Sequence, residues 1–149
     1  MDSKKTILLV EDETILAMAE KLALEKYGYI VKTVTTGEKA IETVKASTEI
    51  DLVLMDINLG KGIDGTQTAE IVLKDHDIPI VFLSSHTSVD VVGRTEKITS
   101  YGYVVKNSGI TVLDASIKMA FRLFEAKQIE KRKEAMIQEN EKKYRGLVE

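Results

Sequence analysis

Five short apolar runs alternate along this chain with stretches in which apolar residues recur at helical spacing. The apolar runs lie at 6–10, 29–36, 51–56, 78–84 and 101–106. The helical stretches lie at 13–27, 37–46, after Gly65, at 88–99 and from about 108 onward. Strands that alternate with helices form a parallel sheet covered on both faces. We therefore predict a doubly wound α/β fold with a five-stranded parallel sheet and an extended C-terminal helix.

Composition excludes several classes of protein. The chain has no cysteine, which rules out a disulfide scaffold, a zinc finger and a thiol nucleophile, and it has only two histidines. No apolar run approaches the ~20 residues that span a bilayer, and the N-terminus lacks a signal-peptide layout. The net charge of −3 provides no general basic field for nucleic acid. We expect a cytoplasmic domain that binds neither nucleic acid nor membrane within this segment.

Polar side chains stand where the predicted strands end. Glu11 and Asp12 follow the first strand, Asp56 closes the third, Ser84 closes the fourth, and Lys106 closes the fifth. In an open parallel sheet the carboxyl ends of the strands line one crevice, and ligands bind where the strand order reverses. With the order 2-1-3-4-5, strands one and three are neighbours at that point. The three carboxylates should then lie within a few ångströms of one another.

This arrangement predicts a metal-assisted phosphoryl-transfer site. Three carboxylates facing one ammonium raise one another's pKa unless a cation neutralises them, and oxygen-only ligands favour Mg²⁺, with Mn²⁺ as the alternative. Asp56 would act as the nucleophile and form an acyl phosphate. The cation and Lys106 would spread the charge of the transferred group, and the Ser84 hydroxyl would donate to a phosphoryl oxygen.

Four segments together resemble the receiver domain of two-component response regulators. They are ILLVEDE at 7–13, LVLMDINLGKGIDG at 52–65, IPIVFLSSH at 78–86 and YGYVVK at 101–106, and their order and spacing fit across roughly residues 5 to 124. The resemblance implies a flavodoxin-like sheet of order 2-1-3-4-5. It also implies a partner, a histidine kinase or a phosphotransfer protein, that supplies the phosphoryl group from phosphohistidine.

The resemblance also assigns roles to individual positions. It makes Asp56 the phosphoacceptor and Asp12 the main carboxylate ligand of the metal, with Glu11 acting mostly through metal-bound water. The remaining roles are these: the backbone carbonyl of Asn58 completes the ligands, Ser84 is the hydroxyl residue that swings towards the phosphoryl group, Tyr103 is the switch aromatic, and Asn58 and His86 tune the aspartyl-phosphate lifetime. From the residues alone, Tyr103 could equally be a half-buried aromatic, and His86 a simple loop residue.

Three positions depart from the family pattern. The acidic pair is Glu11–Asp12 where two aspartates are commonest, and the loop after Asp56 is longer than the usual methionine-proline form. Asn107 replaces a proline whose peptide bond is cis in the family. Because a cis bond without proline costs ~3 kcal/mol, we predict a strained cis Lys106–Asn107 bond, with a trans bond and a shifted loop as the alternative.

The last 25 residues differ in character from the rest of the chain. Thirteen of the 25 residues from Glu125 to Glu149 are charged, and the helical pattern continues through them. We predict a receiver domain at 1–124 and a helical linker at 125–149. A solitary helix with so few apolar residues is marginal, so we expect a homodimer through helix five and its extension; a solvated, fraying tail is the alternative. The final segment ENEKKYRGLVE resembles the segment that leads into a PAS domain. We therefore expect this chain to belong to a longer protein with a receiver followed by a PAS domain, with a histidine-kinase core as a further candidate domain.

Two other functions compete with the phospho-switch. A Mg²⁺-dependent phosphatase that forms an aspartyl-phosphate would use the same carboxylates, but the haloacid-dehalogenase type wants a second aspartate two residues after the nucleophile, where this chain has Asn58. A phosphorylation-dead interaction module would not need Asp56 and Lys106. Asp56 as a mere loop cap is the remaining structural alternative. The sequence leaves open whether the domain counts as an enzyme, since a receiver catalyses only its own phosphorylation and dephosphorylation.

Overall fold

The computed structural model describes residues 3–85, 89–99 and 101–148. This part contains five strands and five helices in strict alternation. They are β1 (Thr6–Val10), α1 (Thr14–Lys26), β2 (Ile30–Val34), α2 (Gly37–Ala46), β3 (Leu52–Asp56), α3 (Gly65–Asp75), β4 (Ile80–Ser84), α4 (Val89–Ile98), β5 (Tyr103–Val105) and α5 (Ile110–Val148). The predicted strands and helices are all present. Ser88, the predicted start of the fourth helix, lies outside the described residues.

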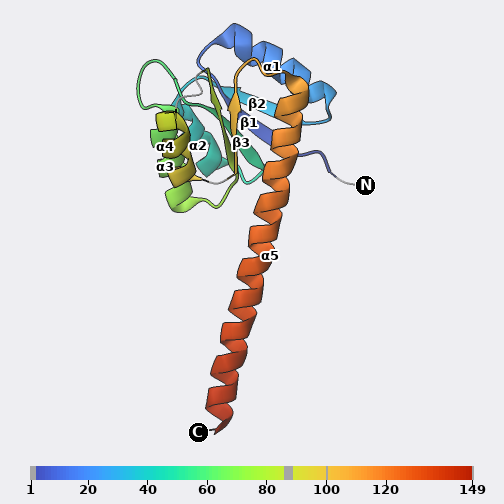
Figure 1. Ribbon diagram of the computed structural model, residues 1–149, viewed down its shortest axis with the longest axis vertical. Helices are drawn as coiled ribbons and strands as arrows, with labels where there is room; N and C mark the ends of the chain where they lie inside the picture. The colour runs from blue at the N-terminus through green and yellow to red at the C-terminus, as the bar shows by residue number, and fades with distance from the viewer. Residues whose placement is uncertain (1–2, 86–88, 100, 149) are drawn as a thin grey trace.

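All strand pairs are parallel, and the sheet order is β2-β1-β3-β4-β5. Figure 1 shows the sheet between two layers of helices, with α1 and α5 on one face and α2, α3 and α4 on the other. The predicted fold class and strand order are confirmed. Because β1 and β3 pair directly, the residues that follow them emerge side by side at one edge of the sheet.

The core has two halves because successive strand residues point to opposite faces of the sheet. Leu8 and Val10 pack with α2 and α3, whereas Ile7 and Leu9 pack with α1 and α5. Every residue of β1, β3 and β4 is buried. Continuous burial explains why these strands consist almost entirely of apolar residues, as expected for central strands of a covered parallel sheet.

Helix α1 packs with a different face from the one that its apolar spacing predicts. The structure buries Ala17 and Leu24 of this helix. The apolar residues at helical spacing, from which the inner face is predicted, are Ile15, Leu16, Ala19, Leu22, Ala23 and Tyr27. Ile15 is 84% exposed and Leu22 is 61% exposed. The prediction was wrong because α1 carries apolar residues around most of its circumference, so periodicity alone does not single out one face.

Helix α5 runs 39 residues, from Ile110 to Val148, and only its first half lies against the sheet. Leu113, Ile117 and Ala120 are buried in the core. Farther along the helix, Gln128 Nε2 and Lys131 Nζ lie 2.6 and 3.0 Å from the Asp77 carboxylate. Figure 1 shows the helix continuing well beyond the globular part. No helix among the described residues is both long and apolar enough to cross a membrane.

Candidate functional site

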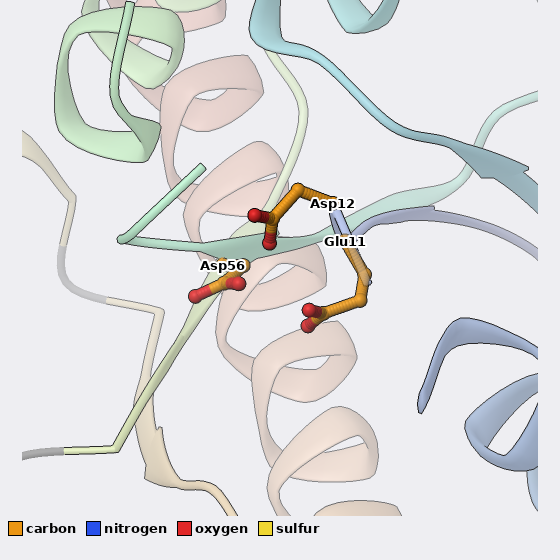
Figure 2. Close-up of side chains that lie close together, drawn as sticks. All are labelled: Glu11, Asp12 and Asp56. Carbon is orange, nitrogen blue, oxygen red and sulfur yellow. The ribbon is translucent and has the colours of Figure 1, made fainter. Parts of the chain in front are cut away.

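Three carboxylates meet at the carboxyl edge of the sheet. Glu11 and Asp12 follow β1, Asp56 ends β3, and one carboxylate oxygen from each lies within 4.8 Å of the others. Figure 2 shows the three side chains gathered at this point. Glu11 is completely buried and Asp56 is 2% exposed, while Asp12 is exposed. The strand order predicts this juxtaposition, because β1 and β3 are neighbours.

Lys106 joins two of these carboxylates. Its Nζ lies 2.8 Å from Glu11 Oε2 and 2.8 Å from Asp56 Oδ2, and the lysine side chain is only 15% exposed. The other Asp56 oxygen, Oδ1, accepts a hydrogen bond of 3.1 Å from the Asn58 backbone N–H. The pairing of β5 brings Lys106 here, since its backbone N–H donates to the Ser84 carbonyl at 2.7 Å.

The site is short of positive charge. Burial raises the pKa of both Glu11 and Asp56 above their ordinary values, and the nearby Lys106 ammonium only partly offsets this effect. Burial alone would lower the pKa of Lys106, but its hydrogen bonds and ion pairs with Asp56 and Glu11 outweigh burial and raise that pKa. The lysine therefore stays protonated and the carboxylates still favour a further cation.

The β3–α3 loop, residues 57–64, is held closely against the site. Gly65, the first residue of α3, lies against the strand end: a Cβ there would stand 2.1 Å from the Asp56 carbonyl oxygen. A Cβ on Gly60 would stand 3.1 Å from Asp12 Oδ2, and Gly60 has a positive φ of 69°. Asp64 caps α3 with a complete capping box. Glycine is required wherever the loop passes this close to site atoms.

A cavity of about 380 Å³ opens over these residues. The cavity is lined by four of the predicted site residues, Asp12, Asp56, Asn58 and Lys106, so a ligand in it could contact all four. Ser84 itself is 1% exposed at the end of β4, and the next residue, Ser85, lines the cavity. No motif in the sequence singles out Ser85.

Two further predicted site residues, Tyr103 and His86, are not among the described residues that line this cavity. Tyr103 is half-buried and lines a groove between β5 and α5. His86 lies outside the described residues, so its predicted role in lifetime tuning stays a prediction.

Glu20 is a fourth acid near the site that the motif analysis missed. It projects from α1 and lines the same cavity as Asp56 and Lys106. Its Oε2 is buried and finds no hydrogen-bond partner within the described residues. Burial, with a further contribution from Glu11, raises the pKa of Glu20 to about 7. Glu20 could have been found only by knowing which face of α1 is inward, which the sequence pattern misassigned.

The backbone after Lys106 departs from the predicted geometry. Within the described residues no peptide bond is cis, so Lys106–Asn107 is trans and the predicted strained cis bond is wrong. Asn107 adopts a positive φ of 70°. Asparagine enters this left-handed region more readily than most residues. The loop thus turns through Asn107 and avoids the cost of a cis bond without proline.

These residues fit a hard divalent cation. Carboxylate oxygens, two of them buried beside a single lysine, are the ligands that Mg²⁺ uses in proteins. The donor set contains no sulfur or imidazole among the described residues, which disfavours softer metals. Glu11, Asp12 and Asp56 are therefore the residues able to hold such an ion.

Comparisons with known proteins agree with this geometry. Residues 7–118 match the Response regulator receiver domain family. Transcriptional regulatory protein AfsQ1 of Streptomyces coelicolor is 31% identical over 118 residues, which cover 78% of this chain and 51% of that protein. The chain spans about half the length of the curated relatives it matches.

Two solved structures are closely similar. The N-terminal domain of a response regulator/sensory box/GGDEF three-domain protein from Carboxydothermus hydrogenoformans is 45% identical, with a TM-score of 0.76 over 83% of this chain and 98% of that one. A fusion that contains a yeast trimeric coiled coil is 42% identical, with a TM-score of 0.83 over 95% of both chains. The family match covers most of the chain and includes every carboxylate of the site, so the chain belongs to the response regulator receiver domain family.

Proposed function

We propose that this domain accepts a phosphoryl group from phosphohistidine onto Asp56 and changes its surface in response. The observation that carries the proposal is Lys106 Nζ, held 2.8 Å from the Asp56 carboxylate beside two further acids in an open cavity. A lysine and a cation site flanking one buried carboxylate suit a nucleophile that receives an anionic group.

In the reaction, an oxygen of Asp56 attacks phosphorus, the phosphorus–nitrogen bond breaks, and its electron pair returns to the histidine ring. Hydrolysis reverses the loading: water attacks phosphorus, the bond to Asp56 breaks, and inorganic phosphate leaves. Bound Mg²⁺ would supply charge neutralisation for the phosphoryl oxygens. Lys106 would stabilise the same charge, Asn58 would offer its carbonyl to the cation, and Ser84 would contribute its hydroxyl.

The decisive test uses a small phosphodonor. Incubation with Mg²⁺ and acetyl phosphate should add one phosphoryl mass to the wild type, and Asp56→Asn should add none because it lacks the nucleophilic oxygen. Intact-mass spectrometry measures both. Asp12→Asn is a partial control, expected to react slowly because a cation ligand is weakened. Labelling of Asp56→Asn at the wild-type level would refute the proposal, and sustained turnover of phosphate esters would favour the rival phosphatase.

The phosphodonor partner has a suitable surface next to the site. Ile15, Met18 and Leu22 form an exposed apolar stripe on α1. A second cavity of about 250 Å³ lies between α1 and the segment after Lys106. Exposed apolar surface of this kind marks sites of protein association, and we propose that a helical histidine kinase or phosphotransfer protein docks here. A kinase or phosphotransfer protein that carries labelled phosphohistidine should pass the label to Asp56. If Asp56 is labelled by acetyl phosphate but not by such proteins, this partner is contradicted.

We also propose that residues 1–124 form the receiver and 125–149 a helical linker to a further sensory domain in a cytoplasmic protein. The similarity to the first domain of a response regulator/sensory box/GGDEF protein supports this order. Beyond Lys131 every described side chain of α5 is exposed, including Met136 and Ile137, which are 63% and 58% exposed. Two such helices would cover these residues in a coiled coil.

If the chain dimerises through α5, its apparent molecular mass in solution should increase with protein concentration. The wild-type chain should sediment as a dimer, whereas the double variant Met136→Glu with Ile137→Glu should sediment as a monomer because it places four buried charges in the shared seam. Analytical ultracentrifugation measures both, and Lys133→Glu with Glu134→Lys, which keeps the net charge, serves as the control. A monomeric wild type, or a double variant that still dimerises, would exclude this interface.

A further inference from the structure

The β3–α3 loop touches a second helix at its far end, away from the carboxylates. Asn58 lies near its start and lines the site cavity, and residues 62–63 lie against the first turn of α2. The loop has eight residues, two of them glycines with positive φ. Such a loop is conformationally free unless something fixes it, because glycine populates many backbone conformations.

One contact is a hydrogen bond to a carboxylate. The Ile63 backbone N–H donates to Glu38 Oε1 at 3.1 Å. Gly62 lies directly under the same carboxylate: a Cβ there would stand 2.7 Å from Oε1, and its φ is +86°. The hydrogen bonds from Ile63 and from its own backbone lower the pKa of Glu38. The acceptor is therefore a carboxylate at neutral pH.

A second contact is apolar and equally close. A Cβ added to Gly37, the first residue of α2, would stand 2.9 Å from Ile63 Cγ1. Only glycine leaves room for this side chain at the start of α2. The backbone and the side chain of Ile63 thus both contact the first two residues of α2, Gly37 and Glu38.

The other end of the loop is fixed by the site itself. Asn58 N–H donates to Asp56, and Gly65 N–H donates to the Ile57 carbonyl at 2.9 Å. The first and last residues of the loop therefore lie beside Asp56, while Glu38 holds residues 62–63. Movement of residues 62–63 away from α2 would change the path of residues 58–61, which join them to the cavity.

We propose that Glu38 is a positioning residue that fixes the β3–α3 loop and so keeps Asn58 in place for the divalent cation. Glu38 acts through the Ile63 N–H and does not bind the ion. The role rests on the proposed function, since it concerns the cation that phosphoryl transfer requires. It assigns to α2 a part in building a site whose proposed cation ligands all come from strand ends and the loops that follow them.

Three substitutions separate anchoring from simple charge. Glu38→Gln keeps both the length and the acceptor oxygen, Glu38→Asp keeps the charge but falls short by about 1.5 Å, and Glu38→Ala lacks both. We expect the dissociation constant for Mg²⁺ to rise about three- to tenfold in the Asp and Ala variants and to stay near the wild-type value in the Gln variant. Isothermal titration calorimetry with MgCl₂ measures these values.

Hydrogen exchange of the metal-free protein gives a readout independent of phosphorylation. The Ile63 amide should exchange faster in Glu38→Asp and Glu38→Ala, and at the wild-type rate in Glu38→Gln. Glu42→Ala, on the exposed side of the same helix, is the matched control and should change neither measurement. Weakened Mg²⁺ binding in Gln with normal binding in Asp would show a remote charge effect and overturn the proposal, as would unchanged values in all three. Failure of acetyl phosphate to label Asp56 would refute the proposed function while leaving these results interpretable.

Discussion

Lys106→Met should lower the free energy of unfolding by about 3–5 kcal/mol at pH 8 in the absence of divalent cations. The substitution leaves Glu11 and Asp56 buried without the ammonium that lies 2.8 Å from each. Methionine keeps an unbranched stem that reaches as far as the lysine Cε and lacks only the ammonium group, so the loss reports charge more than packing. Urea unfolding followed by circular dichroism measures the change.

The pH and ion dependence of this loss identify its cause. In Lys106→Met the folded protein should hold protons on these carboxylates more tightly than the unfolded chain, so its deficit should shrink as pH falls and the carboxylates become neutral. Added MgCl₂ should also restore stability, because it binds only the folded site. Lys32→Met removes a pair whose side chains are 44% and 74% exposed, and it should cost less than about 1 kcal/mol. Equal costs for both substitutions would contradict the charge argument.

Glu20→Gln should stabilise the protein by about 2–3 kcal/mol at pH 8 and have little effect below pH 4.5. The pKa of Glu20 rises from 4.5 to about 7 on folding, chiefly because of burial. Between these values the folded chain binds more protons than the unfolded chain, so the contribution of Glu20 to stability falls as pH rises through this window and is fully unfavourable above pH 7. Glutamine removes the ionisation and with it this part of the pH dependence.

Chemical unfolding of both proteins from pH 4 to 8 in EDTA tests this expectation. The difference between the two curves should grow steadily across the window. Glu25→Gln, an exposed position on the same helix, is the control and should follow the wild type. A constant difference at all pH values would mean that glutamine acts through packing, and that Glu20 does not titrate as its burial indicates.

The sequence predicted those features that follow from the order of strands. Once β1 and β3 are neighbours, Glu11, Asp12 and Asp56 must converge, and no side-chain detail is needed. The inward face of α1 was predicted wrongly because Ile15 and Leu22 satisfy helical spacing as well as the buried residues do. Glu20 was missed for the same reason.

Other features depend on contacts that no local pattern encodes. The hydrogen bond from Ile63 to Glu38 joins residues 25 positions apart, and neither residue belongs to a motif with recognised chemistry. The trans bond before Asn107 reflects a balance between two costs: cis geometry without proline, and a left-handed residue. The sequence identified the first cost, but only coordinates show that asparagine accepts the second.

Asp77, which contacts Gln128 and Lys131, divides α5 into an inner part that runs along the globular body and an outer arm that extends beyond it. The outer arm, residues 132–148, extends roughly 25 Å at 1.5 Å per residue. A tilt of about 10° at that contact would carry the far tip sideways through roughly 4 Å, more than a third of the ~10 Å diameter of a helix. A small change in how the inner part of α5 packs on the sheet would therefore displace the C-terminal end of the helix by several ångströms.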